Sequence, residues 1–171
     1  TNRIVPRDGL PSGSSGGVIQ IKSKHITDYF TSNSGTYVDI TGHNITITPT
    51  RADSKILIQY WINWMHAGGN DTAATLRLLR NGTVIGSDSG NPMNDDRMGM
   101  ITMYMAAQAH FSVSGFNYLD SPGTTSALTY KTQLHLDSTS FTGGNIWGVN
   151  RYPALDDYRG SSSITAYEVS G

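Results

Sequence analysis

The sequence predicts an all-β fold, an antiparallel two-sheet sandwich of jelly-roll type with about ten strands. Short runs in which Val, Ile, Tyr and Thr alternate with polar residues recur along the chain, and such alternation is typical of half-buried strands. Gly, Ser, Thr and Asn, the usual turn residues, are used heavily between these runs. No segment shows convincing helical periodicity, and 171 residues suit one domain.

The first strands are expected near the start of the chain. Residues 18–22 alternate, and residues 26–30 continue as a partly apolar extended stretch. Two strands, 37–40 and 45–47, are expected on either side of the dipeptide Gly-His. Pro49 ends the second of these, because proline has no N–H for a strand ladder.

The strongest strand is predicted over residues 55–65. Its β-branched and aromatic content favours a strand over a helix. Because successive side chains of a strand point to opposite faces, the run divides into two sets. One set, expected to face the core, is Ile56, Ile58, Tyr60, Ile62 and Trp64; the other is Leu57, Gln59, Trp61, Asn63 and Met65.

The clearest local signal is Asn81-Gly82 between two apolar segments. This dipeptide predicts a two-residue type I′ hairpin turn. Residues 117–126 are expected to form a turn region. Further strands are expected within 100–116 (one or two), at 127–138 and at 163–171, with a long aromatic, partly strand-like region before the last.

The second face of the 55–65 strand is too apolar to remain in water. Leu57, Trp61 and Met65 would form a contiguous apolar patch, which monomers usually avoid. Met103 and Met105, opposite Tyr104, repeat the pattern on another strand. Burial between copies of the chain in a closed cyclic assembly is one solution; cover by a loop or by the N-terminal segment is the other.

Composition argues against several partners. The net charge is −1 and only 15% of residues are charged, so we expect neither nucleic-acid binding nor membrane attachment. The chain has no cysteine, which excludes disulfides and cysteine-bound metals and favours folding in a reducing cytosol. No apolar run approaches the roughly 20 residues of a membrane-spanning helix.

Catalytic and metal-binding patterns are weak, so we expect no enzyme activity, no metal and no cofactor. The five histidines lack metal-site spacing, although a single histidine on a threefold axis could supply three ligands. The acidic pairs Asp95-Asp96 and Asp156-Asp157 lack the alternating oxygen ligands of a calcium loop. Solvated turns explain them better.

A binding surface is expected in the stretch "GGNIWGVNRYPALDDYRG", residues 143–160. Rigid aromatics beside Asn, Asp and Arg suit recognition of a sugar or a protein. The alternative is that its Trp and Tyr only pin a long loop to the sandwich. The candidate residues are Asn145, Trp147, Asn150, Arg151, Tyr152, Asp156, Asp157 and Tyr158, with Asn94, Asp95 and Arg97 on a second loop.

The strand and turn motifs resemble a known group. They are "GGVIQI", "TYVDITGHNITITP", "SKILI", "LRNGTVIG" and "ITAYEV", and they run from Gly17 to Val169. In this order they resemble the C-terminal domains of bacteriophage and cyanophage virion proteins, chiefly tail fibres. The strand order also resembles the trimeric jelly roll of the complement and tumour-necrosis-factor superfamily.

The resemblance implies a homotrimeric head domain, residues 18–171, on a tail fibre that contacts a host surface glycan or protein. Residues 1–17 would connect it to the rest of the fibre or virion protein, and it would fold in the host cytoplasm. The implied trimer interface comprises Leu57, Gln59, Trp61, Asn63, Met65, Tyr104 and Tyr167. Two alternatives remain: a capsid decoration, head-fibre or trimerisation module without a receptor, and a polysaccharide-degrading enzyme.

Overall fold

The computed structural model describes residues 17–67, 72–87, 99–105, 110–136, 146–151 and 158–171. Within these residues the chain forms eleven strands in two antiparallel sheets and no helix. The predicted all-β sandwich is therefore confirmed. The predicted segments that fall outside this description, including residues 1–16, stay predictions.

Sheet A holds six strands, in the order β1-β11-β4-β10-β2 with β8 on the other side of β4. β11 and β10 lie end to end along one edge of β4, and β8 follows the other edge. The bounds are β1 Val18–Ile26, β2 Phe30–Ser32, β4 Lys55–Ala67, β8 His110–Asp120, β10 Ile146–Val149 and β11 Ser162–Val169.

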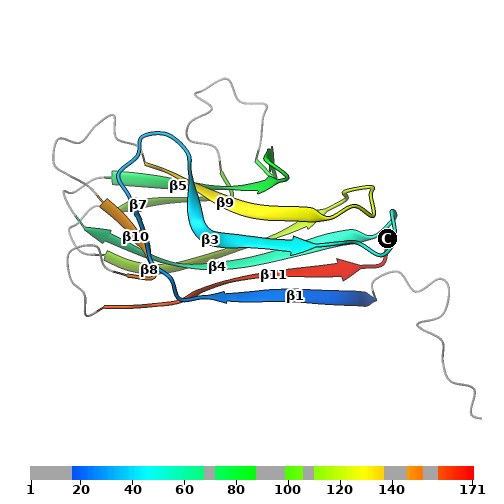
Figure 1. The fold of residues 1–171 in the computed structure, drawn as a ribbon. Helices are drawn as coiled ribbons and strands as arrows, with labels where there is room; N and C mark the ends of the chain where they lie inside the picture. The colour runs from blue at the N-terminus through cyan, green and yellow to red at the C-terminus, as the bar shows by residue number, and fades with distance from the viewer. Residues whose placement is uncertain (1–16, 68–71, 88–98, 106–109, 137–145, 152–157) are drawn as a thin grey trace, which may run out of the picture.

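Sheet B holds five strands, in the order β3-β9-β5-β6 with β7 also paired to β5. Taken with sheet A, this is a jelly-roll arrangement, in which the chain passes back and forth between two sheets that face each other (Figure 1). The bounds are β3 Val38–Ile47, β5 Thr72–Arg80, β6 Thr83–Ile85, β7 Ile101–Met105 and β9 Leu128–Leu136.

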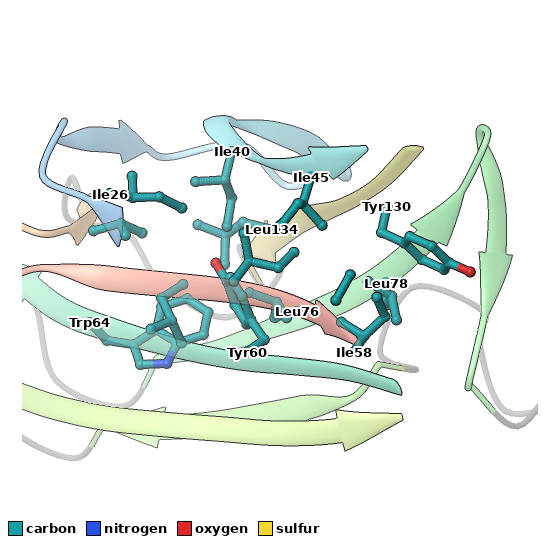
Figure 2. Close-up of a cluster of buried hydrophobic side chains, with 14 of the residues drawn as sticks. Ile26, Ile40, Ile45, Ile58, Tyr60, Trp64, Leu76, Leu78, Tyr130 and Leu134 are labelled. Carbon is teal, nitrogen blue, oxygen red and sulfur yellow. The ribbon is translucent and has the colours of Figure 1, made fainter. Parts of the chain in front are cut away.

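The core lies between the two sheets. Figure 2 shows Ile58 and Tyr60 of β4 close to Leu76 of β5, with the other labelled side chains gathered between the same two layers. All five residues predicted to face the core from β4 are completely buried. The alternation of the sequence therefore identified the inner face of this strand correctly.

The predicted hairpin is also confirmed. Arg80 pairs with Thr83 across the turn, and Asn81 and Gly82 have φ angles of 48° and 88°. Two positive φ values in succession are the requirement of a type I′ turn. Asn and Gly tolerate them, which is why this dipeptide could be read from the sequence.

Two boundaries differ from the predictions. Residues 38–47 form one strand with a bulge between Asp39 and Asn44, rather than two strands separated by a turn. Gly42 supplies the positive φ of 79° inside that irregularity. β8 continues to Asp120, where a turn region was expected, because it stays paired with β4 as far as Ile56. The Asp120 carboxylate accepts hydrogen bonds from Arg80 at 2.7 Å and from Tyr130 at 2.6 Å, both on sheet B.

A second buried polar cluster joins the sheets through Tyr60. Its hydroxyl accepts a hydrogen bond from Thr132 at 3.3 Å and also contacts Nδ1 of His43. Since a phenol has one proton, Tyr60 donates it to the unprotonated Nδ1 of a neutral His43. Burial, followed by the charge of Lys24, lowers the pKa of His43 to about 4.

A buried carboxylate, Glu168, lies at the Lys55 end of β4, where it pairs with Ile56. It accepts hydrogen bonds from the side chain of Gln20 at 2.6 Å and from the backbone and hydroxyl of Thr50 at 2.7 and 2.8 Å. Burial alone would raise its pKa, but these donors outweigh burial and lower the pKa to about 2. Gly17 and Ser170 exchange two hydrogen bonds at this same end.

Candidate functional site

The outward side of sheet A forms one continuous surface across β1, β11, β4 and β8. The strand register identifies the residues of this surface, because directly paired residues on neighbouring strands point to the same side of a sheet. One row runs Ile21–Tyr167–Leu57–Leu119, and a second contains Ser163–Trp61–Gly115. We call this surface the outer face of sheet A: Ile21, Ser23, His25, Ser163, Thr165, Tyr167, Val169, Leu57, Gln59, Trp61, Asn63, Met65, Phe111, Val113, Gly115, Asn117 and Leu119.

None of these residues is an Asp, Glu, Lys or Arg. Lys55, opposite Val169, stands only at the margin. Large apolar side chains are nevertheless open to water here: Trp61 and Leu119 are each 50% exposed and Val113 is 62% exposed. An exposed surface of this size without charge, rich in aromatic and aliphatic groups, has the composition of a protein interface core.

Trp61 lies at the centre of this face, over Gly115 of β8. A Cβ placed on Gly115 would approach the Trp61 indole to 2.8 Å and the carbonyl oxygen of Tyr60 to 2.7 Å. Only glycine therefore leaves room for the ring in this position. The indole covers the glycine with one side and leaves half of its surface in water.

The outward side of sheet B has the opposite character. Arg77 donates to Gln133 at 2.8 Å, and Gln133 donates to Asp39 at 2.7 Å. Lys131 pairs with Asp39 at 2.8 Å, and the hydrogen bonds from Lys131 and Gln133 lower the pKa of Asp39. This network spans β5, β9 and β3 and suits contact with solvent.

The predicted interface must be corrected at Tyr104. Tyr104 is 64% exposed, but it pairs with Ala73 on β5 and so lies on the outward side of sheet B. It cannot share a surface with Trp61. The other predicted interface residues, Leu57, Gln59, Trp61, Asn63, Met65 and Tyr167, do share the outer face of sheet A.

One end of the outer face is covered from within the chain. Met65 is almost completely buried, and a Cβ on Gly160 would meet the side chain of Asn63 at 2.4 Å. The segment 158–160 therefore packs over this end. Among the described residues, cover from within the chain reaches the Asn63–Met65 end but not Trp61, Val113 or Leu119. Cover by the N-terminal segment, the other form of this alternative, concerns residues 1–16, which lie outside the described residues.

The predicted binding residue Trp147 is a core residue, and its assignment to a binding loop is wrong. It lies on β10 opposite His66 and is completely buried. Its ring packs edge-on against Trp64, with centroids 5.8 Å apart, and against His66 at 5.2 Å. The alternative that this tryptophan pins its segment to the sandwich is therefore correct.

Asn150 is also structural rather than available for a ligand. It is buried with a φ of 62°, and its amide nitrogen donates to the carbonyls of Ile26 and Asp28 at 3.0 and 2.9 Å. Its side-chain oxygen accepts from Ser162 at 2.6 Å. These bonds fix the point at which the chain leaves β10 and returns to β11.

Two predicted binding residues do reach the surface. Arg151 stacks on the Tyr29 ring with 4.6 Å to its centroid, and Tyr158 packs on Phe111 with centroids 5.3 Å apart. The predictions for Asn145, Tyr152, Asp156, Asp157, Asn94, Asp95 and Arg97 lie outside the described residues.

Several surface residues were missed from the sequence. Phe111, Val113 and Leu119 belong to the outer face, and the strict alternation of residues 111–119 was the signal that could have found them. Tyr29 was missed because its neighbour Arg151 comes from a distant segment. Within the described residues, no cluster of three or more His, Asp or Glu could hold a metal ion, and no helix could span a membrane.

The comparisons with known proteins add likenesses of fold. No family model matches the chain, and no curated protein matches it. The chain is similar to a solved structure of the Gx strain of infectious bursal disease virus, with 15% identity, a TM-score of 0.42, and coverage of 96% of this chain and 42% of that one. It is similar to the VP2 subviral particle of the same virus, with 15% identity, a TM-score of 0.41, and coverage of 98% and 42%.

A third likeness is to the dimeric latent PorU of Porphyromonas gingivalis, with 13% identity, a TM-score of 0.27, and coverage of 92% of this chain and 14% of that one. The chain thus spans less than half the length of each of these three proteins. The fold class rests on the strand order of the chain itself.

Proposed function

We propose that this chain is a non-enzymatic virion structural domain, the homotrimeric head of a phage tail fibre that contacts the host surface. The uncharged outer face of sheet A carries the proposal. Contact between copies would bury its exposed tryptophan, leucine and valine. Each Å² of apolar surface that is removed from water in this way contributes roughly 25 cal/mol to the stability of the assembly. A second copy is a suitable partner because a closed cyclic assembly buries the same face on every subunit.

The trimeric state and the virion location are supported by the sequence motifs. They resemble trimeric jelly rolls and phage fibre domains over residues 17–169. The fold agrees with that placement in one respect. Gly17 and Ser170 lie together beside the Lys55 end of β4, so the chain enters the sandwich at the end opposite Met65. The remote end is thereby left to face a host.

Tryptophan fluorescence tests the assembly. Of the three tryptophans, Trp64 and Trp147 are buried and Trp61 is 50% exposed. Iodide should quench the native chain no more than the Trp61→Phe variant, because assembly shields Trp61. A quenchable fraction present in the native chain and absent from Trp61→Phe would contradict burial of the outer face.

The virion location needs a separate test. A gold-labelled antibody raised against the purified domain should mark the fibre tips of intact particles. Labelling of the capsid shell would instead identify a decoration module, and particles that bind no antibody would refute the virion role.

A further inference from the structure

A row of uncharged polar residues crosses the outer face of sheet A. The strand register places four of them side by side on β1, β11, β4 and β8: Ser23, Thr165, Gln59 and Asn117. Along β4, Leu57 and Trp61 stand on either side of Gln59 on the same face. On this central strand the row therefore interrupts an apolar stretch.

Gln59 differs from the other members of the row. Ser23 and Thr165 hydrogen-bond to each other through their hydroxyls at 2.9 Å, and Asn117 is exposed on β8, at the edge of the sheet. Gln59 is half-buried, and its Oε1 accepts a hydrogen bond from the Tyr167 hydroxyl at 3.3 Å. Within the described part of the chain its amide nitrogen has no hydrogen-bond partner.

This open amide restricts what can cover the face. A glutamine amide has two N–H donors and an oxygen with two acceptor positions, and Tyr167 occupies one of those positions. Any molecule that covers Trp61 and Leu57 also removes Gln59 from water, and a buried polar group without a partner is costly. The covering surface must therefore present a hydrogen-bonding group at this point, which a purely apolar surface such as lipid cannot do.

Charge restricts the partner further. The outward side of sheet B carries Arg77, Lys131 and Asp39, so contact with that side would bury charges against an apolar surface. The outer face of sheet A on another copy brings no charged residue. It also brings its own Gln59, whose amide both donates and accepts. This face is therefore complementary to itself.

We infer that Gln59 fixes the alignment of the copies in the assembly. Gln59 amides of different copies hydrogen-bond to one another at the centre of the interface, and three of them can close a ring in which each nitrogen donates to the next oxygen. Apolar contacts around Trp61 stabilise many alignments, whereas only one brings the amides together, as a single buried amide does in coiled coils. This inference rests on the proposed assembly and names the residue that determines its geometry.

Removing the amide without adding charge tests the inference. Light scattering and native mass spectrometry of the full chain over a dilution series should give a single mass of three chains for the native protein. Gln59→Leu should lose this single mass and form assemblies of two or more different sizes. These should persist on dilution at least as far as the native trimer, because an apolar replacement leaves no unpaired group.

Two further variants complete the experiment. Gln59→Met, an unbranched side chain of similar length, should behave like Gln59→Leu. Gln133→Leu is the matched control, because Gln133 is a glutamine on the outward side of sheet B, where it bonds to Asp39. It should keep the single mass of the native chain.

The outcomes separate this inference from the proposed function. A single mass of three chains for both Gln59 variants would refute the role of Gln59 and leave the trimer intact. Dissociation of these variants to single chains would also refute it, because the amide would then supply stability rather than alignment. A native mass of one chain at every concentration would refute the trimer and this inference together, since the chain itself or another molecule would then cover the face.

Discussion

The indole ring of Trp61 covers Gly115 on the neighbouring strand, and a Cβ at position 115 would come within 2.8 Å of that ring. This glycine has no turn to form, since it lies inside β8 and pairs directly with Trp61. Its role is to let a large ring rest on the sheet. The other side of the ring is exposed to solvent at the middle of a surface that carries no charged residue.

Gly115→Ala should therefore disturb both the ring and the sheet. The added methyl meets the indole and the carbonyl of Tyr60, and overpacking of this kind costs about 1–3 kcal/mol. Chemical denaturation at one fixed protein concentration measures the free energy of unfolding. Asn117→Ala, on the same strand and face, is the control and should change it by less than about 0.5 kcal/mol; equal values for the two variants would contradict the packing described.

A charge on the outer face of sheet A should separate the subunits. Leu119→Glu places a carboxylate beside Leu57, and burying it unpaired in an interface costs several kcal/mol. Light scattering of this variant should give the mass of one chain. Its circular dichroism should remain that of the native fold. Tyr104→Glu, at an exposed position on the opposite sheet, should keep the native mass. Dissociation by both variants or by neither would place the interface elsewhere.

Glu168 should make the domain sensitive to strong acid. Its pKa is about 2 in the fold against 4.5 when exposed, so its contribution is present above about pH 4.5 and is lost as the pH falls toward 2. At 1.36 kcal/mol per unit the loss is about 3 kcal/mol. Glu168→Gln should lower the free energy of unfolding at pH 7 and flatten its pH dependence in that window.

The surface carboxylate Asp53 provides the control for Glu168. Asp53 pairs with Arg51, but both are more than half exposed, and solvent screening leaves such pairs little effect on stability. Asp53→Asn should therefore retain the native acid profile. If Glu168→Gln also retained the native acid profile, the role assigned to Glu168 would be contradicted.

His43 should cause a separate loss of stability at milder pH. Its pKa is about 4 in the fold against 6.5 when exposed. The unfolded chain therefore takes up the proton first, and stability falls as the pH drops from about 6.5 to about 4. Protonation of Nδ1 also removes the acceptor of the Tyr60 hydroxyl.

Denaturation at a series of pH values checks this for the native chain and His43→Asn, whose amide keeps an acceptor but does not titrate. The native chain should lose about 3 kcal/mol across the window, and the variant should lose much less. Parallel profiles would show that another group is responsible.

The sequence predicted those features that depend on local chemistry. Asn81-Gly82 specified its turn because few residues accept two positive φ angles. Alternation in residues 55–65 separated the core face from the outer face because side chains of a strand alternate strictly. Neither result needs knowledge of the rest of the chain.

The errors arose where the partner strand decides the outcome. Tyr104 has the exposure expected of an interface residue, but alternation does not say to which sheet β7 belongs. Trp147 stands among glycines and polar residues and looked like part of a loop, whereas pairing of β10 with β4 turns it toward Trp64. The contacts of Arg151 with Tyr29 and of Tyr158 with Phe111 join residues far apart in the sequence, which only the fold brings together.

The solution mass of the full chain, measured by light scattering over a dilution series, tests the central claim most directly. Within the described part of the chain, Trp61, Val113 and Leu119 on the outer face of sheet A are exposed to solvent, and the account predicts that copies of the chain cover them. A mass of three chains that persists on dilution is the predicted result. A mass of one chain at every concentration would contradict it.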